Sequence, residues 1–242
     1  MISDTFGENW KEEFIVWDNC AGTCNLTKDY KFSELYISTL FDAEVTEGLK
    51  YNPEAVHFQF DFLNDDIPNP QALFDTETKL PEGLLDALRK NKKILFLLNP
   101  PYHRGGGGNR FRTGNTSNIA FTKVNAMMKE EEIGPSSANL YTQFLYRIYR
   151  IKRDFNLSNL FICVICPPKF LTAETFKGFR TVFLNEFHFE RGFFLKADMF
   201  ENVQGSRSFS CTLWSSGVTE NKDDFIIDCC VFDKSGEVHT VR

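Results

Sequence analysis

The residues with the clearest capacity for chemistry are Asn99-Pro100-Pro101-Tyr102, which follow the hydrophobic run ILFLL at 94–98. Two consecutive prolines fix an extended backbone and remove two N–H donors, so local carbonyl groups are left as acceptors beside the Asn99 amide oxygen. Paired acceptors of this kind bind an NH2 group. Accepting both N–H bonds of a delocalised amine returns electron density to its nitrogen and directs it at an electrophile. Tyr102 supplies a ring that can stack on the planar group that carries the amine. The alternative is a strand that simply ends in a Pro-Pro turn.

Polar residues end three of the hydrophobic runs. Asp18 ends FIVWD (14–18), Asp61 ends VHFQFD (56–61) and Asn99 ends ILFLLN (94–99). In an open α/β sheet, ligands bind beyond the carboxyl ends of the strands. We therefore expect these three side chains to mark one edge of a sheet.

The first of these ends leads into a turn of small residues, among them Cys20, Ala21 and Gly22. Small residues allow a backbone to pass close to a ligand, and Asp18 places a carboxylate beside them. This suits a cationic or amine-bearing ligand. The turn lacks G-x-G-x-x-G, and its carboxylate would repel a pyrophosphate, so a dinucleotide is disfavoured. An ordinary strand-to-helix turn is the alternative.

Asp61-Phe62, at the end of the third run, pairs a hydrogen-bond acceptor with an aromatic face. The two together could hold the exocyclic amine and the ring of an adenine. The alternative is an Asp that caps its own loop and a Phe that belongs to the core.

The order of the runs indicates an α/β fold. Short apolar runs at 14–18, 34–39, 56–61, 94–99 and 160–166 alternate with segments able to form helices, which is typical of a parallel sheet with helical crossovers. Three further strand-like segments follow without long helical spacers, so an antiparallel hairpin should finish the sheet. The segments expected to be helical are 25–33, 42–50, 81–91, 140–155 and 172–187, the last opened by Thr172.

Composition bounds the possible functions. With 242 residues and 42% hydrophobic content, the chain can form one domain, 1–242, with a full core. The net charge of −6 provides no general surface for nucleic acid, so any such contact must be local. Seven cysteines without a signal peptide fit a reducing cytoplasm, and Cys163-x-x-Cys166 reads as core strand because no second ligand pair accompanies it. We therefore expect no metal site, and no run is long enough to span a membrane.

Taken together, these motifs resemble the adenine-specific DNA methyltransferases that modify the N6 amino group. Asp18-x-x-x-Gly22 resembles their cofactor-binding loop, Asp61-Phe62 their adenine-binding strand end, and Asn99 to Tyr102 their catalytic motif. The resemblance continues through the helix after the catalytic loop, the fifth strand with its exit, and an aromatic residue before the seventh strand. Those segments are Asn139–Phe144, Cys163–Leu171 and Met199-Phe200.

The resemblance implies a Rossmann-like S-adenosylmethionine-dependent methyltransferase fold, with a mostly parallel seven-stranded sheet and a C-terminal antiparallel hairpin. It implies direct methyl transfer from S-adenosylmethionine to adenine N6 in DNA, without a metal, within a restriction-modification or phage modification system of the cytoplasm. Asn99 and the carbonyl of Pro100 would hold the amine, while Tyr102 and Phe200 would enclose the extruded adenine. The implied cofactor residues are Asp18, Cys20, Ala21 and Gly22 at the methionine end, Asp42 at the ribose, and Asp61 with Phe62 at the adenine.

A long connection, residues 103–139, follows the catalytic motif and is rich in Gly, Asn, Ser and Thr. A connection of this length is functional or disordered. Arg104, Arg110 and Arg112 lie in it, and we expect them to contact DNA as part of a loop over the active site, with a solvated loop as the alternative. The later cations Arg147, Arg150, Lys152 and Arg153 are expected on the solvent face of their helix.

The chain also departs from the family. Cys24 stands where the cofactor loop usually has a second Gly, and no acid directly ends the second strand. A target-recognition region is not apparent, so a missing recognition domain or a partner subunit is expected to find the DNA site. The competing functions are a methyltransferase acting on a protein glutamine or an RNA base, and a binding subunit that keeps the fold but has lost turnover.

Overall fold

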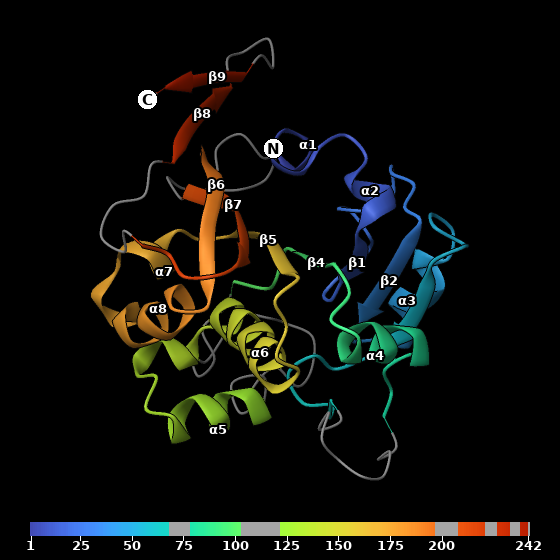
Figure 1. The fold of residues 1–242 in the computed structure, drawn as a ribbon, viewed down its shortest axis with the longest axis horizontal. Helices are drawn as coiled ribbons and strands as arrows, with labels where there is room; N and C mark the ends of the chain where they lie inside the picture. The colour runs from blue at the N-terminus through green and yellow to red at the C-terminus, as the bar shows by residue number, and fades with distance from the viewer. Residues whose placement is uncertain (68–77, 103–121, 197–207, 221–226, 233–237, 242) are drawn as a thin grey trace, which may run out of the picture.

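The computed structural model describes residues 1–67, 78–102, 122–196, 208–220, 227–232 and 238–241. In this part of the chain, nine strands form one sheet in the order β3-β2-β1-β4-β5-β7-β6-β8-β9 (Figure 1). The strands are β1 Ile15–Asp18, β2 Glu34–Thr39, β3 Val56–Gln59, β4 Ile94–Leu98, β5 Leu160–Cys166, β6 Phe187–Lys196, β7 Ser208–Ser216, β8 Asp228–Phe232 and β9 Val238–Val241.

Strands β1 to β5 are parallel to one another, as the spacing of the apolar runs predicts. Strand β7 is antiparallel to both β5 and β6, so the predicted antiparallel finish is confirmed. Strand β8 then pairs in parallel with β6, and β9 pairs antiparallel with β8. The seven strands that the resemblance implies correspond to β1 to β7. The last strand-like segment of the sequence forms β8, and β9 pairs with it beyond the expected sheet. Figure 1 shows this hairpin projecting from the body of the molecule.

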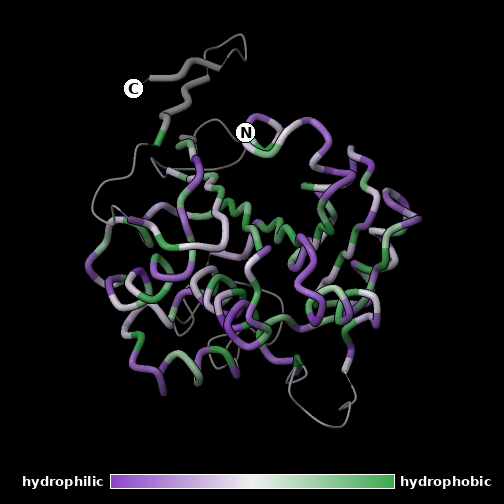
Figure 2. The backbone as a smooth tube through the Cα atoms, in the orientation of Figure 1, coloured by the Kyte–Doolittle hydropathy of each residue, from purple (hydrophilic) through white to green (hydrophobic). Residues whose placement is uncertain are grey.

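The central strands are buried on both faces of the sheet. All five residues of β4 are buried, and Figure 2 shows the hydrophobic colour concentrated along the central strands. Parallel strands covered on both sides need apolar side chains at every position, which is why their sequences do not alternate. One face packs against the larger helical layer, the other against the N-terminal helices and the loop after β1. The helices are α1 Ile2–Phe6, α2 Trp10–Glu13, α3 Asp42–Gly48, α4 Glu82–Arg89, α5 Lys123–Glu130, α6 Leu140–Asp154, α7 Lys169–Thr172 and α8 Lys177–Leu184.

Several predicted helices are confirmed, and three expectations need correction. Helices α3, α4 and α6 occupy the predicted segments, but residues 25–33 form no helix: 25–29 are turns and 30–33 are irregular. The helix expected to open at Thr172 instead begins at Lys177, after a short helix α7 and a 3₁₀ turn. The connection 103–139 is not without structure, since α5 and a 3₁₀ helix, Pro135–Ala138, lie in its second half.

The expectation for the cations of α6 was also wrong in part. Arg147 is buried, and its guanidinium donates a hydrogen bond of 3.0 Å to the backbone carbonyl of Asp65. Burial lowers the pKa of Arg147, and the carboxylates of Asp66 and Asp154 oppose that shift. The side chain lies inward because the loop after β3 runs over this helix and presents a carbonyl group to it.

Candidate active site

The predicted polar edge is assembled by the parallel pairing of the first four strands. Trp17 pairs with Tyr36 of β2 and Phe96 of β4, so β1 and its two neighbours end at nearly the same level. Asp18 and Asn99 therefore lie at the same edge of the sheet, and the loop that follows β3 brings Asp61 toward it. The sequence placed these residues correctly because the position of a strand end follows from where its apolar run stops.

Asp18 is a buried carboxylate. It is 1% exposed, and neither oxygen makes a hydrogen bond of good geometry with the described residues, although the backbone N–H of Cys20 lies close. Burial raises the pKa of Asp18 to about 7, while the backbone N–H of Cys20 acts in the opposite direction. A buried carboxylate with so little hydrogen bonding from the described residues can accept a hydrogen bond from a ligand.

The turn after Asp18 has two residues in the left-handed backbone region. Gly22 has φ of 51°, and a Cβ placed on it would meet no atom within 4 Å, so open space borders the turn at this point. Cys24 has φ of 60°, a conformation that favours glycine. Glycine adopts this backbone more readily than other residues do, and Cys24 adopts it here.

The thiol of Cys24 is directed away from solvent. It is fully buried, and its Sγ lies 3.0 Å from a Cβ built on Gly48 of α3. Burial raises the pKa of Cys24 to about 11, with smaller contributions from the charges of Asp18 and Glu44. The side chain thus fills the space between the turn and α3, which leaves Gly22 free at the surface of the turn.

Cys20 connects the turn to the catalytic motif. Burial raises the pKa of its thiol, the charge of Asp18 adds to that shift, and the backbone N–H of Asn99 opposes it. Cys20 is therefore close to both predicted parts of the site. Ala21 is fixed beside it, since its backbone N–H donates to the carbonyl of Ser38 at 3.2 Å.

Asn99 lies just beyond the end of β4 and is exposed, while Pro100 behind it is buried. The hydroxyl of Tyr102 donates to Oδ1 of Asn99 and also lies 3.2 Å from the carbonyl oxygen of Ile165. The ring of Tyr102 packs on Phe209 of β7, with 5.0 Å between ring centroids. In this structure Tyr102 therefore contacts the acceptor that would hold an amine, and burial raises the pKa of its hydroxyl.

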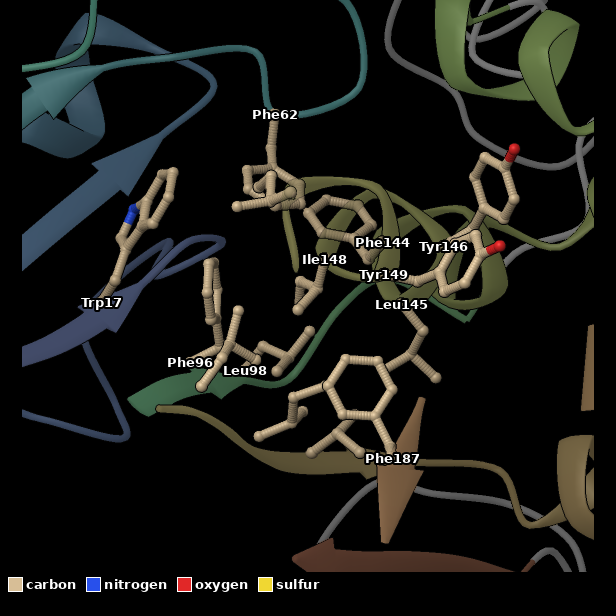
Figure 3. Packing of buried hydrophobic residues seen from close by; sticks show 14 of the residues in the cluster. Trp17, Phe62, Phe96, Leu98, Phe144, Leu145, Tyr146, Ile148, Tyr149 and Phe187 are labelled. Carbon is tan, nitrogen blue, oxygen red and sulfur yellow. The ribbon is translucent and has the colours of Figure 1, made fainter. Parts of the chain in front are cut away.

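Asp61 and Phe62 have different surroundings. The carboxylate of Asp61 accepts from the backbone N–H of Leu63 at 3.1 Å and from the Asn64 amide at 2.8 Å, which stabilises its own loop. The ring of Phe62 is 2% exposed and stacks on Phe144 of α6, with 5.4 Å between centroids (Figure 3). The Phe62 ring is part of the core here and has no free face, whereas Asp61 remains half-buried at the edge.

Asp42, the residue implied for the ribose, is the first residue of α3 and is exposed. Four other predicted residues, Phe200, Arg104, Arg110 and Arg112, lie outside the described residues. The structure therefore brings together Asp18, Cys20, Asn99 and Tyr102, with Gly22 in the same turn as Cys20.

The far end of the long connection is anchored by a buried polar network. The hydroxyl of Thr122 donates to Oε1 of Gln143 at 2.6 Å and accepts from the backbone N–H of Asn125 at 2.9 Å. The Gln143 amide in turn donates to the carbonyl of Ser137 at 2.8 Å. Gln143 belongs to the segment that resembles the family's helix after the catalytic loop, and its role here is to fix where that loop returns to the body.

Sequence reasoning missed Asn19. This side chain is 2% exposed, and neither its oxygen nor its nitrogen has a partner within the described part of the chain. Its position directly after a strand-ending Asp was a signal that could have drawn attention to it. No group of three or more His, Cys, Asp or Glu among the described residues is placed to hold a metal ion, and no described helix has the length and hydropathy to cross a membrane.

This arrangement of strands and strand-end loops is the Rossmann-like fold of S-adenosylmethionine-dependent methyltransferases. No family model and no curated protein matches the chain. Several solved structures do match it. The chain is similar to DrdV in its complex with DNA, with a TM-score of 0.56 and 14% identity over 100% of this chain and 28% of that one.

Two bacterial proteins show the same similarity. One, from Listeria monocytogenes, is described as a class I S-adenosylmethionine-dependent methyltransferase (TM-score 0.54, 10% identity, 91% of this chain and 60% of that one). The other is a methyltransferase subunit of a type I restriction-modification system from Streptococcus thermophilus (TM-score 0.53, 14% identity, 95% of this chain and 45% of that one). The chain thus spans less than two thirds of each of these three chains.

Proposed function

We propose that this chain transfers the methyl group of S-adenosylmethionine to the N6 amino group of adenine in DNA. The observation that carries the proposal is the position of Asn99-Pro100-Pro101-Tyr102 at the carboxyl end of β4, beside the buried carboxylate of Asp18. Acceptors for an NH2 group and an acceptor for a cationic ligand thus lie at one edge. Neighbours whose titles name DNA and restriction-modification support DNA as the substrate class.

The residues at this edge fit the cofactor. Asp18 offers two buried oxygens that make no hydrogen bond of good geometry with the described residues, which suits a cation-bearing molecule such as S-adenosylmethionine. Gly22 borders the open space a ligand needs. Asp61, and Asp42 farther along the edge, are the acids available for the adenine and ribose. When bound, the cofactor supplies an electrophilic methyl group on a positively charged sulfur.

The residues of β4 would act on the amine. Oδ1 of Asn99 and the carbonyl of Pro100 accept its two N–H bonds, which raises the electron density on nitrogen. With the cofactor bound, its methyl carbon would be the electrophile for the nitrogen lone pair, the carbon–sulfur electron pair would remain on sulfur, and the nitrogen would lose its extra proton to water. Tyr102 must first release Asn99 for this to happen. Its ring and that of Phe200 would then enclose the extruded base.

DNA contact by the body of the protein is expected to be weak, because many of its cations are paired with local acids. Lys79 pairs with Asp65, and Lys123 with Asp66, both next to the site. We propose that Arg104, Arg110 and Arg112 supply phosphate contacts, and that a recognition domain or partner subunit supplies the remainder.

The test uses the purified full chain with S-adenosylmethionine labelled in its methyl group, mixed-sequence duplex DNA, and the recovered nucleosides. We expect label in N6-methyladenine, and its loss in Asn99→Ala. Label that enters an RNA base or a protein glutamine, but not DNA, would overturn the substrate assignment. Calorimetry that detects no binding of S-adenosylmethionine would instead favour a subunit without turnover.

A further inference from the structure

The N-terminus of α5 is capped in part by the loop that follows β3. The N–H groups in the first turn of an α-helix have no acceptor within the helix itself. In α5, the N–H of Lys123 donates to Oδ1 of Asn64 at 3.0 Å. The next N–H, from Val124, donates to the carbonyl of Leu63 at 3.3 Å. The third, from Asn125, is bonded by the side chain of the helix's own N-cap residue. The loop after β3 therefore supplies the acceptors for the first two N–H groups of this helix.

The side chain of Asn64 connects this helix with the candidate cofactor edge. Its Nδ2 donates to Oδ2 of Asp61 at 2.8 Å, while its Oδ1 accepts from Lys123. The two partners fix the orientation of the amide, because a backbone N–H can only donate and an ionised carboxylate can only accept. One planar group thus lies between the acid proposed for the cofactor's adenine and the first residue of α5.

Asp61 can still accept a hydrogen bond from a ligand beside these contacts. Its Oδ1 accepts from the backbone N–H of Leu63 at 3.1 Å and its Oδ2 from Asn64, and each carboxylate oxygen has more than one lone pair. The side chain is half-buried at the edge of the sheet. A donor from a ligand would therefore meet a carboxylate whose orientation Asn64 already fixes.

Helix α5 needs acceptors from outside its own segment. It has eight residues, and an isolated helix of this length is marginal in water, so its stability comes from contacts with the rest of the protein. An acceptor at the N-terminus is one of these contacts, and losing it weakens a helix. A contact that holds Asn64 in place therefore also stabilises α5.

From these contacts, and resting on the proposed function, we propose that Asn64 is a positioning residue that couples the cofactor site to α5. A cofactor bound through Asp61 would hold Asn64, and Asn64 would hold the start of the helix. The coupling is reciprocal, because a folded α5 also keeps Asn64 oriented toward Asp61. The chain returns to the described residues from the catalytic motif at Thr122, so the stability of this junction would depend on the cofactor.

Hydrogen exchange of the backbone amides measures the opening of α5 in the full chain, with and without saturating S-adenosylhomocysteine. In the wild type, this ligand should slow exchange in α5 by about 5-fold or more, the usual size of a coupling between two sites. Helix α8, Lys177–Leu184, is the internal reference. It also has eight residues, and its first turn follows a 3₁₀ helix, Glu174–Phe176, instead of the loop after β3. The slowing in α5 should exceed that in α8.

Two variants separate the two bonds of Asn64. Asn64→Asp keeps an oxygen for the N–H of Lys123 but places a second carboxylate against Asp61. Its α5 should exchange at nearly the wild-type rate without ligand and should lose the additional slowing by the ligand. Asn64→Ala removes both bonds, so its α5 should exchange about 5-fold faster even without ligand. In this variant, too, the ligand should slow α5 no more than α8.

Asn91 provides the matched control, because its amide also joins two turns. Its Oδ1 accepts from the backbone N–H of Ser158 at 2.9 Å, and its Nδ2 donates to Oγ of the same residue at 2.8 Å. Since its φ is 50°, Asn91→Gly keeps the backbone conformation while removing both bonds. This variant should show the full wild-type effect of the ligand on α5.

The outcomes separate the two proposals. If calorimetry shows that the wild type does not bind S-adenosylhomocysteine, the proposed function fails and this inference fails with it. If the wild type binds the ligand but α5 is slowed no more than α8, or if both Asn64 variants keep the slowing, the coupling alone is overturned. Asn64 variants that no longer bind the ligand would make the residue part of the binding site and would also overturn its role as a coupling residue.

Discussion

Asp18 is the residue whose ionisation should control the cofactor site. Burial raises its pKa to about 7, so near neutral pH the free protein holds a mixture of the acid and the carboxylate. A cationic ligand binds the carboxylate form. As pH increases toward about 7, the affinity for S-adenosylmethionine should increase by up to about 10-fold per pH unit. Above about pH 7 it should level off. Calorimetry between about pH 5 and about pH 9 measures this, and Asp18→Asn should remove the dependence.

The ionisation of Asp18 should also make the stability of the folded protein depend on pH, in the direction opposite to cofactor affinity. Its pKa in the folded protein is raised above its ordinary value of 3.8, so the folded state holds the proton more tightly than the unfolded chain. Its contribution to stability is full below about pH 4 and is lost as pH rises to about 7. Stability of the free protein and cofactor affinity should therefore respond to this residue in opposite directions, and a parallel rise of both would contradict the assignment.

The ring and the hydroxyl of Tyr102 should have different roles, and two variants can distinguish them. The hydroxyl contacts Oδ1 of Asn99, so Tyr102→Phe removes a donor that competes with the amine and should keep kcat/KM at or above the wild-type value. Tyr102→Ala also removes the ring, and loss of base stacking should lower kcat/KM by about 10- to 100-fold. Steady-state methylation of DNA measures both. A Phe variant as impaired as the Ala variant would show that the hydroxyl itself is required.

Residues differ in how well the sequence predicts the position and burial of their side chains. Asp18 and Asn99 are predictable because each ends a run of apolar residues, and the edge of the sheet follows from that. Phe62 is not, because its burial depends on Phe144, which is distant in the chain and reaches it only once α6 has packed. For the same reason the unpaired state of Asn19 is visible only in the folded structure.

Among the elements, the start of α5 should be the most sensitive to a small change. Thr122 caps this helix and holds Oε1 of the fully buried Gln143. Thr122→Val keeps the shape but removes both bonds, and should lower the free energy of unfolding by about 2–4 kcal/mol. Thr46→Val, at an exposed hydroxyl on α3, should change it by less than about 0.5 kcal/mol. Denaturant unfolding of the two variants gives the comparison, and equal effects would contradict the network's importance.

Helices were predictable where apolar residues recur with helical periodicity. They were not predictable where tertiary contacts determine the local structure. Helix α6 shows a clear apolar stripe over four turns, and its bounds follow. Helix α5 has only eight residues, too few for its four apolar side chains to form a clear stripe, and its cap also bonds to α6. Residues 25–33 lack a stripe of their own, and tight turns there bring Leu26 and Phe32 onto the sheet.

At the scale of the whole molecule, the net charge is acidic, so DNA binding depends on a local group of cations. The salt dependence of binding reports how many of these cations contact phosphates. Each cation that contacts a phosphate contributes about one unit to the slope of log K against log salt concentration. Replacing Arg104, Arg110 and Arg112 with Gln should therefore reduce the slope by about three units. The same change at Lys90, Lys92 and Lys93, which precede β4 at the opposite edge of the sheet, is the matched control and should leave the slope unchanged. Fluorescence anisotropy over a salt series measures both, and equal reductions would place the DNA elsewhere.

The β8–β9 hairpin has a consequence for how the molecule opens. Among the described residues, strand β8 pairs with β6 at two positions, Phe193 with Asp228 and Phe194 with Cys229, whereas β6 and β7 pair along nearly their full length. Cooperative units of unfolding follow such differences in attachment. Amide hydrogens of β8 and β9 should therefore exchange faster than those of β4 and β5 in a hydrogen-exchange experiment, at a rate that cofactor leaves unchanged. Uniform protection across all nine strands would contradict this. The strands that carry the site then form one unit of stability and the hairpin another, so the hairpin can open and close while the methyl-transfer edge stays intact.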